Sequence, residues 1–199
     1  MTRLLMTALL FGLLLRSAPA AEVATRDVSG IRVPVTVEMQ DPPLRLTLNG
    51  SGVRRKLFFR IYVAALYLPE HTSDASRILA LRQPARLDMQ FLYRFIRRGK
   101  LLASWDEGFR SNLSPQEYQA LKPQIERFEA LFGNARRGDH YSFTCVPGRG
   151  VRVRLGRKPP VWIEGDAFAR ALLAIWLGKH PADAELKLAL LGGSPSASP

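Results

Sequence analysis

Hydrophobic and polar residues alternate along several stretches of the chain, and this period of two predicts β-strands with one buried face. Residues 31–37 show it first, and residues 44–48 repeat it after a turn at residues 41–43. Asn49-Gly50 predicts another turn, because this dipeptide favours tight hairpins. Residues 86–93 then alternate again. We therefore expect antiparallel strands in the first half of the chain.

The clearest hairpin pattern lies within residues 140–155. Its first strand places Tyr141, Phe143 and Cys145 on one face, and residues 147–150 supply the turn. Cys145 is near His140 and Arg149 in sequence, so a nucleophile is one interpretation of it. We favour a small buried residue, because Cys145 is in line with two aromatic side chains.

Residues 57–68 are continuously apolar, aromatic or β-branched apart from Arg60, which predicts a central strand covered on both faces. A period near 3.6 predicts the helices. They are expected at residues 72–81, 98–113, 115–132, 166–177 and 184–191. The third begins at Ser114-Pro115-Gln116-Glu117, which combines a capping box with proline at the first helical position.

This order of strands, helices, a hairpin and further helices predicts an α+β domain, with a large antiparallel sheet covered by helices on one face. At 199 residues and 47% hydrophobic content, the chain is large enough for one substantial core. We expect residues 21–43 to form a lead-in, mobile up to residue 30, and the first strand. The main domain follows at residues 44–192, and residues 193–199 have the composition of a disordered tail.

Residues 1–20 have the features of a secretory signal peptide. Arg3 precedes an apolar run at residues 4–15, and Ala18-Pro19-Ala20 fits a cleavage site for small residues. The run is too short to span a bilayer as a helix, which needs about 20 residues. We therefore expect export, to the periplasm or the medium. A single cysteine then excludes an intramolecular disulfide.

The formal net charge is +12, which is compatible with nucleic acid, an anionic membrane surface or an acidic ligand as partner. A cationic segment after the aromatic run at residues 91–95 superficially resembles a nucleic-acid platform; it comprises Arg94, Arg97, Arg98 and Lys100. No binding motif accompanies it, so we interpret it as a surface loop and expect no nucleic-acid partner.

Cofactor and catalytic motifs are missing from the sequence. The three histidines are widely separated, no Gly-Lys-Ser/Thr follows the glycines at residues 50–52, and no Gly-x-Ser-x-Gly elbow occurs. We expect neither a metal site nor a cofactor.

Four segments in order resemble the chalcone isomerase-like family, in particular its exported bacterial members. They are LNGSGVRRKLFFRIYVAALYLPE, GFRSNLSPQEY, the Pro-Gly-Arg-Gly hairpin and IEGDAFARALLAIWLGKHPADAELKLALLG. The resemblance implies an open-faced β-sandwich with a ligand cleft between sheet and helices. It also implies a role for Arg54, in a turn before the central strand. In the plant isomerases this arginine stabilises a phenolate, and in the fatty-acid-binding branch, with a tyrosine on the next strand, it holds a carboxylate.

The resemblance also places the other candidate site residues. Isomerase hydroxyl residues correspond here to Tyr62, Trp105 and Ile175, whereas the arginine and the asparagine, Asn112, are retained. Loss of catalytic hydroxyls beside a retained arginine favours a non-catalytic binder of a fatty acid or similar acidic amphiphile. Arg54 would bind the anion, Tyr62 and Asn112 would assist, and Trp105 and Ile175 would line an apolar pocket.

Other interpretations remain open. One is an isomerase or intramolecular lyase that acts on an unsaturated ketone, with Arg54 stabilising an oxyanion. Arg54 can instead pair with an internal acid, and Tyr62 can be a core residue. A third class of function is contact with an anionic membrane surface through the basic face formed by Arg152, Arg154, Arg157 and Lys158. Arg55 and Lys56 we expect to be solvated.

Overall fold

The computed structural model describes residues 24–193, which form one seven-stranded antiparallel sheet and two short two-stranded sheets. Across the large sheet the order is β11-β10-β9-β6-β5-β4-β3. The strands are β3 (Thr36–Gln40), β4 (Pro43–Lys56), β5 (Phe59–Leu68), β6 (Ala85–Phe91), β9 (His140–Val146), β10 (Gly150–Leu155) and β11 (Val161–Glu164). The expected central strand is confirmed from Phe59 onward, because β5 has a partner on each side, whereas residues 57–58 form an exposed turn and not part of the strand.

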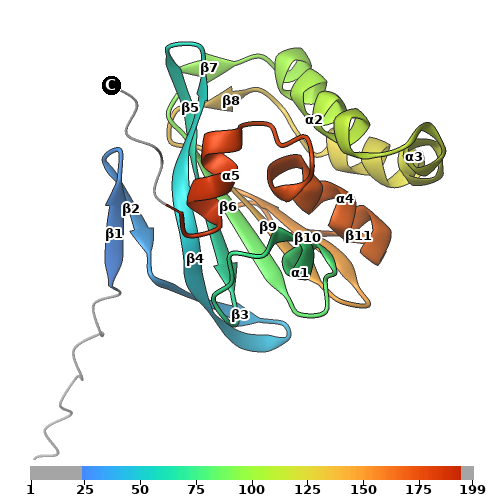
Figure 1. Ribbon diagram of the computed structural model, residues 1–199. Helices are drawn as coiled ribbons and strands as arrows, with labels where there is room; N and C mark the ends of the chain where they lie inside the picture. The colour runs from blue at the N-terminus through green and yellow to red at the C-terminus, as the bar shows by residue number, and fades with distance from the viewer. Residues whose placement is uncertain (1–23, 194–199) are drawn as a thin grey trace, which may run out of the picture.

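The helices lie against one face of this sheet (Figure 1). They are α1 (Ala75–Leu79), α2 (Arg98–Asn112), α3 (Pro115–Ala130), α4 (Asp166–Leu177) and α5 (Ala184–Leu190). The predicted capping box is present at the start of α3, where Ser114 and Glu117 exchange hydrogen bonds. The predicted α+β fold, with a helical layer on one face of a large antiparallel sheet, is confirmed.

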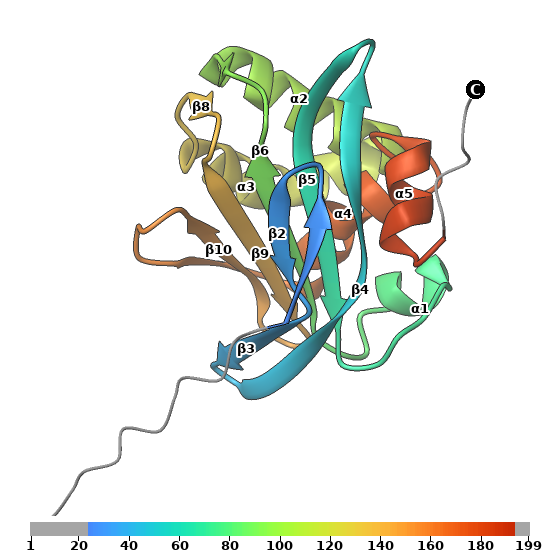
Figure 2. The same cartoon turned by 90° about the vertical axis from the view of Figure 1, so that its left-hand side faces the viewer.

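The other face of the sheet is partly covered by an N-terminal hairpin, as Figure 2 shows. Its strands are β1 (Thr25–Val28) and β2 (Ile31–Pro34). Val33 of β2 is buried in a second, smaller apolar cluster with Val63, Ala65 and Tyr67 of β5. The lead-in expected to be mobile up to residue 30 therefore contains a strand from Thr25. The expected strand at residues 31–37 is divided at Val35 between β2 and β3.

The turn predicted at Asn49-Gly50 is wrong, since β4 continues through both residues with a bulge there. The Asn49 side chain donates hydrogen bonds to the carbonyl oxygens of Thr72 and Leu190, at 3.0 and 2.8 Å. A Cβ at Gly50 would lie 2.2 Å from the Ala189 carbonyl oxygen. These two residues therefore fasten α5 to the sheet, and that requirement explains the Asn-Gly pair.

A last small sheet pairs β7 (Phe95–Ile96) with β8 (Ala135–Arg136). No helix within residues 24–193 combines the length and apolar character needed to cross a bilayer. The signal peptide and most of the tail expected from the sequence, residues 1–20 and 193–199, lie outside the described residues except for Gly193.

Candidate functional site

Arg54 lies on strand β4, directly opposite Tyr62 of β5 in the register of the sheet. Its expected position in a turn is wrong, because β4 continues to Lys56 and the turn follows at residues 57–58. The guanidinium carbon lies 5.6 Å from the centre of the Tyr62 ring, and the Arg54 side chain is half-buried. A permanent cation thus lies at the border between solvent and the apolar layer under the helices.

The Tyr62 hydroxyl connects this cation to the helical layer. It accepts a hydrogen bond of 2.9 Å from the indole Nε1 of Trp176 on α4. Burial raises the pKa of Tyr62 by disfavouring the phenolate, and this outweighs the opposing effect of the Arg54 charge. The hydroxyl is therefore protonated at neutral pH and keeps a proton to donate beside Arg54.

Two buried donors near this point have no acceptor among the described residues. They are Nε of Arg54 and Nε1 of Trp105, whose ring lies 5.8 Å from that of Trp176. A buried donor left without a partner costs about 1–3 kcal/mol. Arg54 and the Tyr62 hydroxyl thus offer N–H and O–H donors to an acceptor, as an anion site requires, while the Trp105 donor lies in the aromatic core.

Trp105 and Ile175, expected to line a pocket, are packed inside the core. The Trp105 ring contacts aromatic neighbours at centroid distances of 5.5 Å for Phe128 and 5.9 Å for Phe143. Ile175 fills the space beside Gly108 so closely that a Cβ there would lie 2.9 Å from it. The space between sheet and helices is therefore filled at these two positions.

Asn112 has a structural environment at the end of α2. Its side-chain amide donates to the carbonyl oxygens of Gly108 and His180, at 3.0 and 2.9 Å, and its oxygen accepts from the His180 backbone N. Both amide protons are thus used to join α2 to the segment after α4. The structure brings together Arg54 and Tyr62, and the assisting role of Asn112 stays a prediction.

Two neighbours of the site were not found by sequence reasoning. Trp176 follows the apolar pattern of α4, and nothing in that pattern indicates its partner 114 residues away. Asp183 caps α5 and also accepts a 2.9 Å hydrogen bond from the backbone N of Arg55. A polar residue before a helix signals a cap, but it does not indicate the second strand that it contacts.

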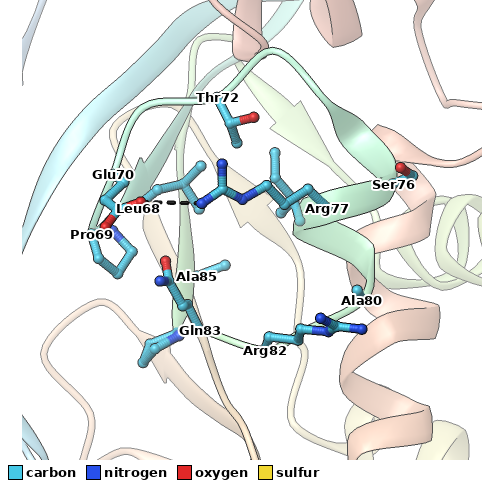
Figure 3. A pocket seen from close by; sticks show the side chains of 12 residues that line it. Leu68, Pro69, Glu70, Thr72, Ser76, Arg77, Ala80, Arg82, Gln83 and Ala85 are labelled. Atoms are coloured by element: carbon cyan, nitrogen blue, oxygen red, sulfur yellow. Dashed lines mark hydrogen bonds and ion pairs between the residues drawn. The ribbon is translucent and has the colours of Figure 1, made fainter.

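A pocket of about 490 Å³ lies at the other end of β5, between that strand and α1 (Figure 3). Arg77 extends across it to an ion pair of 3.1 Å with Glu70. Leu68, Ile78 and Ala85 contribute apolar surface to its lining. Arg77 therefore already has a carboxylate partner, whereas Arg82, which also lines the pocket, forms no ion pair within residues 24–193.

The prediction that Cys145 is a small buried residue is confirmed. Cys145 is fully buried, and burial raises the pKa of its thiol well above the ordinary range, which leaves it unreactive. No group of three or more potential metal ligands gathers within residues 24–193.

Comparison with known families identifies the fold. A family model described as chalcone isomerase-like matches residues 25–192. The chain belongs to the chalcone isomerase-like family. The match begins earlier than the resemblance read from residue 44, and so includes the β1–β2 hairpin.

One solved structure similar to this chain is that of a fatty-acid binding protein of Arabidopsis thaliana. The two share 15% identity with a TM-score of 0.64, over 85% of this chain and 96% of that chain. At this identity the likeness shows the common fold. A search of curated proteins gives no match.

Replacing Tyr62 by phenylalanine in this chalcone isomerase-like chain is expected to lower the free energy of unfolding by about 2 kcal/mol, because the Trp176 Nε1 proton would lose its acceptor in the core. Tyr141→Phe is the matched control, since the Tyr141 hydroxyl makes no hydrogen bond within residues 24–193. Urea denaturation measures both. Equal stability of the two variants would show that the Tyr62–Trp176 hydrogen bond contributes little.

Proposed function

We propose that this protein binds a fatty acid or a similar acidic amphiphile, with Arg54 and Tyr62 holding the carboxylate. The observation that carries the proposal is a half-buried guanidinium, with an unpartnered Nε, beside a neutral buried hydroxyl. Arginine suits this role because its planar fork matches a carboxylate and stays charged when partly buried. The protein would act after export, as the first 20 residues predict.

The apolar chain of such a ligand would extend from Arg54 toward the interior under the helices. Each buried methylene contributes about 0.8 kcal/mol, so a long chain can supply most of the affinity. Aromatic side chains fill this interior, among them Trp105, Phe128 and Trp176. Binding therefore requires the helical layer to move away from the sheet. This opening costs part of the free energy gained by burying the acyl chain of the ligand.

The isomerase alternative is less well supported by these residues. The positions that align with catalytic hydroxyls hold an indole and an aliphatic side chain, Trp105 and Ile175, both buried in the core. The hydroxyl that is present, on Tyr62, accepts from Trp176 and has a raised pKa, so it is a poor base. The set of groups suits recognition of an anion better than proton transfer.

Titration with palmitate tests the proposal. Arg54→Met is expected to weaken binding roughly 10- to 100-fold, because a charge-assisted hydrogen bond contributes about 1.5–3 kcal/mol. Arg55→Met is the matched control, since this neighbouring arginine is exposed. Octanoate should bind wild type more weakly than palmitate. Unchanged affinity in Arg54→Met, or an equal loss in Arg55→Met, would contradict an anion site at Arg54.

A further inference from the structure

The tip of the β4–β5 hairpin, residues 57–59, exposes three large apolar side chains in a row. Leu57 is 84% exposed, Phe58 98% and Phe59 53%. Among the described residues, the other large apolar side chains with comparable exposure are Val161 and Leu188, which stand singly on other elements. Isolated apolar side chains on a surface are ordinary, whereas a contiguous group at a protruding end indicates a contact.

The residue types in this turn suit neither its exposure to water nor its backbone conformation. Leu57 and Phe58 form a two-residue loop, because Lys56 pairs with Phe59. Leu57 has a φ of 54°, a left-handed conformation that two-residue hairpin loops normally give to glycine or asparagine. Neither folding nor solubility is served by leucine and phenylalanine here. A strained position of this kind points to a function of the side chains it presents.

Exposed cations surround the tip. Arg55, Lys56 and Arg60 flank it on the two strands, and within residues 24–193 none of them forms an ion pair. The Phe59 ring also packs edge-on against Tyr93 at 5.5 Å, which brings the segment before β7 to the same end of the molecule (Figure 1). Arg94 in that segment is exposed as well.

We infer that the hairpin tip is a membrane-docking element, which inserts Leu57 and Phe58 into the interface of an anionic bilayer while the surrounding cations bind lipid headgroups. Apolar and aromatic side chains ringed by lysine and arginine are the combination that peripheral proteins use at such interfaces. Each cation near an anionic surface adds to the attraction. The charge and the protruding shape of the tip thus favour an anionic lipid surface as its partner.

This assignment differs from the basic face considered from the sequence. Arg152 and Arg154 line a polar pocket of about 150 Å³ on the face of the sheet opposite the helices, together with Glu38 and Arg86. Headgroups can contact that face, but its lining presents no apolar side chain for insertion. The hairpin tip combines both properties in one protruding turn.

The inference does not rest on the proposed ligand, although the two fit together. Arg54 precedes Leu57 by three residues on an extended strand, so the two lie roughly 10 Å apart along β4. A docked tip would therefore hold the proposed anion site close to the headgroup layer. An amphiphile could then pass between bilayer and protein over a short path.

Flotation with vesicles tests the docking. The probe is vesicles of phosphatidylcholine and phosphatidylglycerol in equal parts, with phosphatidylcholine vesicles alone for comparison. Wild type should bind the anionic vesicles, and Phe58→Ser should reduce the partition coefficient about tenfold or more, because an aromatic side chain no longer leaves water. Leu188→Ser is the matched control, since Leu188 is an exposed apolar residue on α5; it should change partitioning less than about twofold.

Three outcomes would overturn the inference. They are a failure of wild type to bind the vesicles, equal binding of Phe58→Ser and Leu188→Ser, and a loss of all binding at high salt without any dependence on Phe58. The last result would assign the attraction to charge alone. Because Phe58 lies in an exposed turn, Phe58→Ser should fold as wild type by circular dichroism. It should also keep the wild-type affinity for palmitate in solution, so a failed docking surface and a failed ligand site give different results.

Discussion

Replacing Trp105 by alanine is expected to lower the free energy of unfolding by about 4 kcal/mol, the usual loss for a large aromatic residue in a core. Trp105 is 3% exposed and lies at the centre of the cluster between α2, α3, α4 and the sheet. Its ring contacts Phe128, Phe132, Phe143 and Trp176. Urea denaturation at neutral pH measures the change.

Trp105→Phe is the control for this experiment. It keeps most of the aromatic contacts and removes the unpartnered Nε1 donor. The free energy of unfolding should therefore fall by well under half of the amount lost in Trp105→Ala. If Trp105→Ala were as stable as wild type, the Trp105 side chain would line open space, which would contradict a filled interior between sheet and helices. The two variants thus measure the free energy of Trp105 packing that a bound acyl chain must overcome to open this interior.

Replacing Asp88 by asparagine is expected to lower the free energy of unfolding by about 3 kcal/mol at pH 7, because it leaves Arg86 poorly paired in a half-buried position. Asp88 accepts hydrogen bonds of 2.7 and 2.8 Å from the Arg86 guanidinium. His140 Nε2 also lies 3.3 Å from its second oxygen. This cluster lies on the face of the sheet that the β1–β2 hairpin partly covers.

The same carboxylate predicts a dependence of stability on pH. Burial alone would raise the pKa of Asp88, but hydrogen bonds from His140 and Arg86 and the charge of Arg86 hold it below its ordinary value. A pKa lowered on folding contributes stability that is present above the unfolded pKa, near 3.9, and is lost as the pH falls through the folded pKa. Wild type should therefore lose stability on acidification below about pH 4, whereas Asp88→Asn should lose less. Equal acid sensitivity of the two proteins would contradict this assignment.

Sequence patterns predicted much of the fold because local rules decide it. Alternation located β6, β9 and β10, and the capping box at Ser114 fixed the start of α3. The Asn49-Gly50 pair was wrongly interpreted as a turn, because the contact that explains it is made with α5, about 140 residues later. Strand β1 was read as part of a mobile lead-in because it is short and polar, whereas the strand expected at residues 31–37 includes β2.

The site was predictable only in part, because several of its contacts join residues far apart in the sequence. The resemblance selected Arg54 and Tyr62, and the sheet register places them opposite each other. The Trp176 hydrogen bond and the packing of Trp105 and Ile175 depend on how α4 and α2 meet the sheet, which no local pattern specifies. Leu57 and Phe58 were assigned to the buried central strand because they are apolar, whereas the two-residue turn exposes them.

Native mass spectrometry with organic extraction tests whether the protein binds an acidic amphiphile through Arg54. Wild type and Arg54→Met would be expressed with the export signal and purified, and any bound molecule would be extracted and its mass measured. We expect an acyl-chain acid bound to wild type and lost or strongly reduced in Arg54→Met. The same acid retained equally by both proteins, or no acidic amphiphile on wild type even after incubation with palmitate, would contradict it.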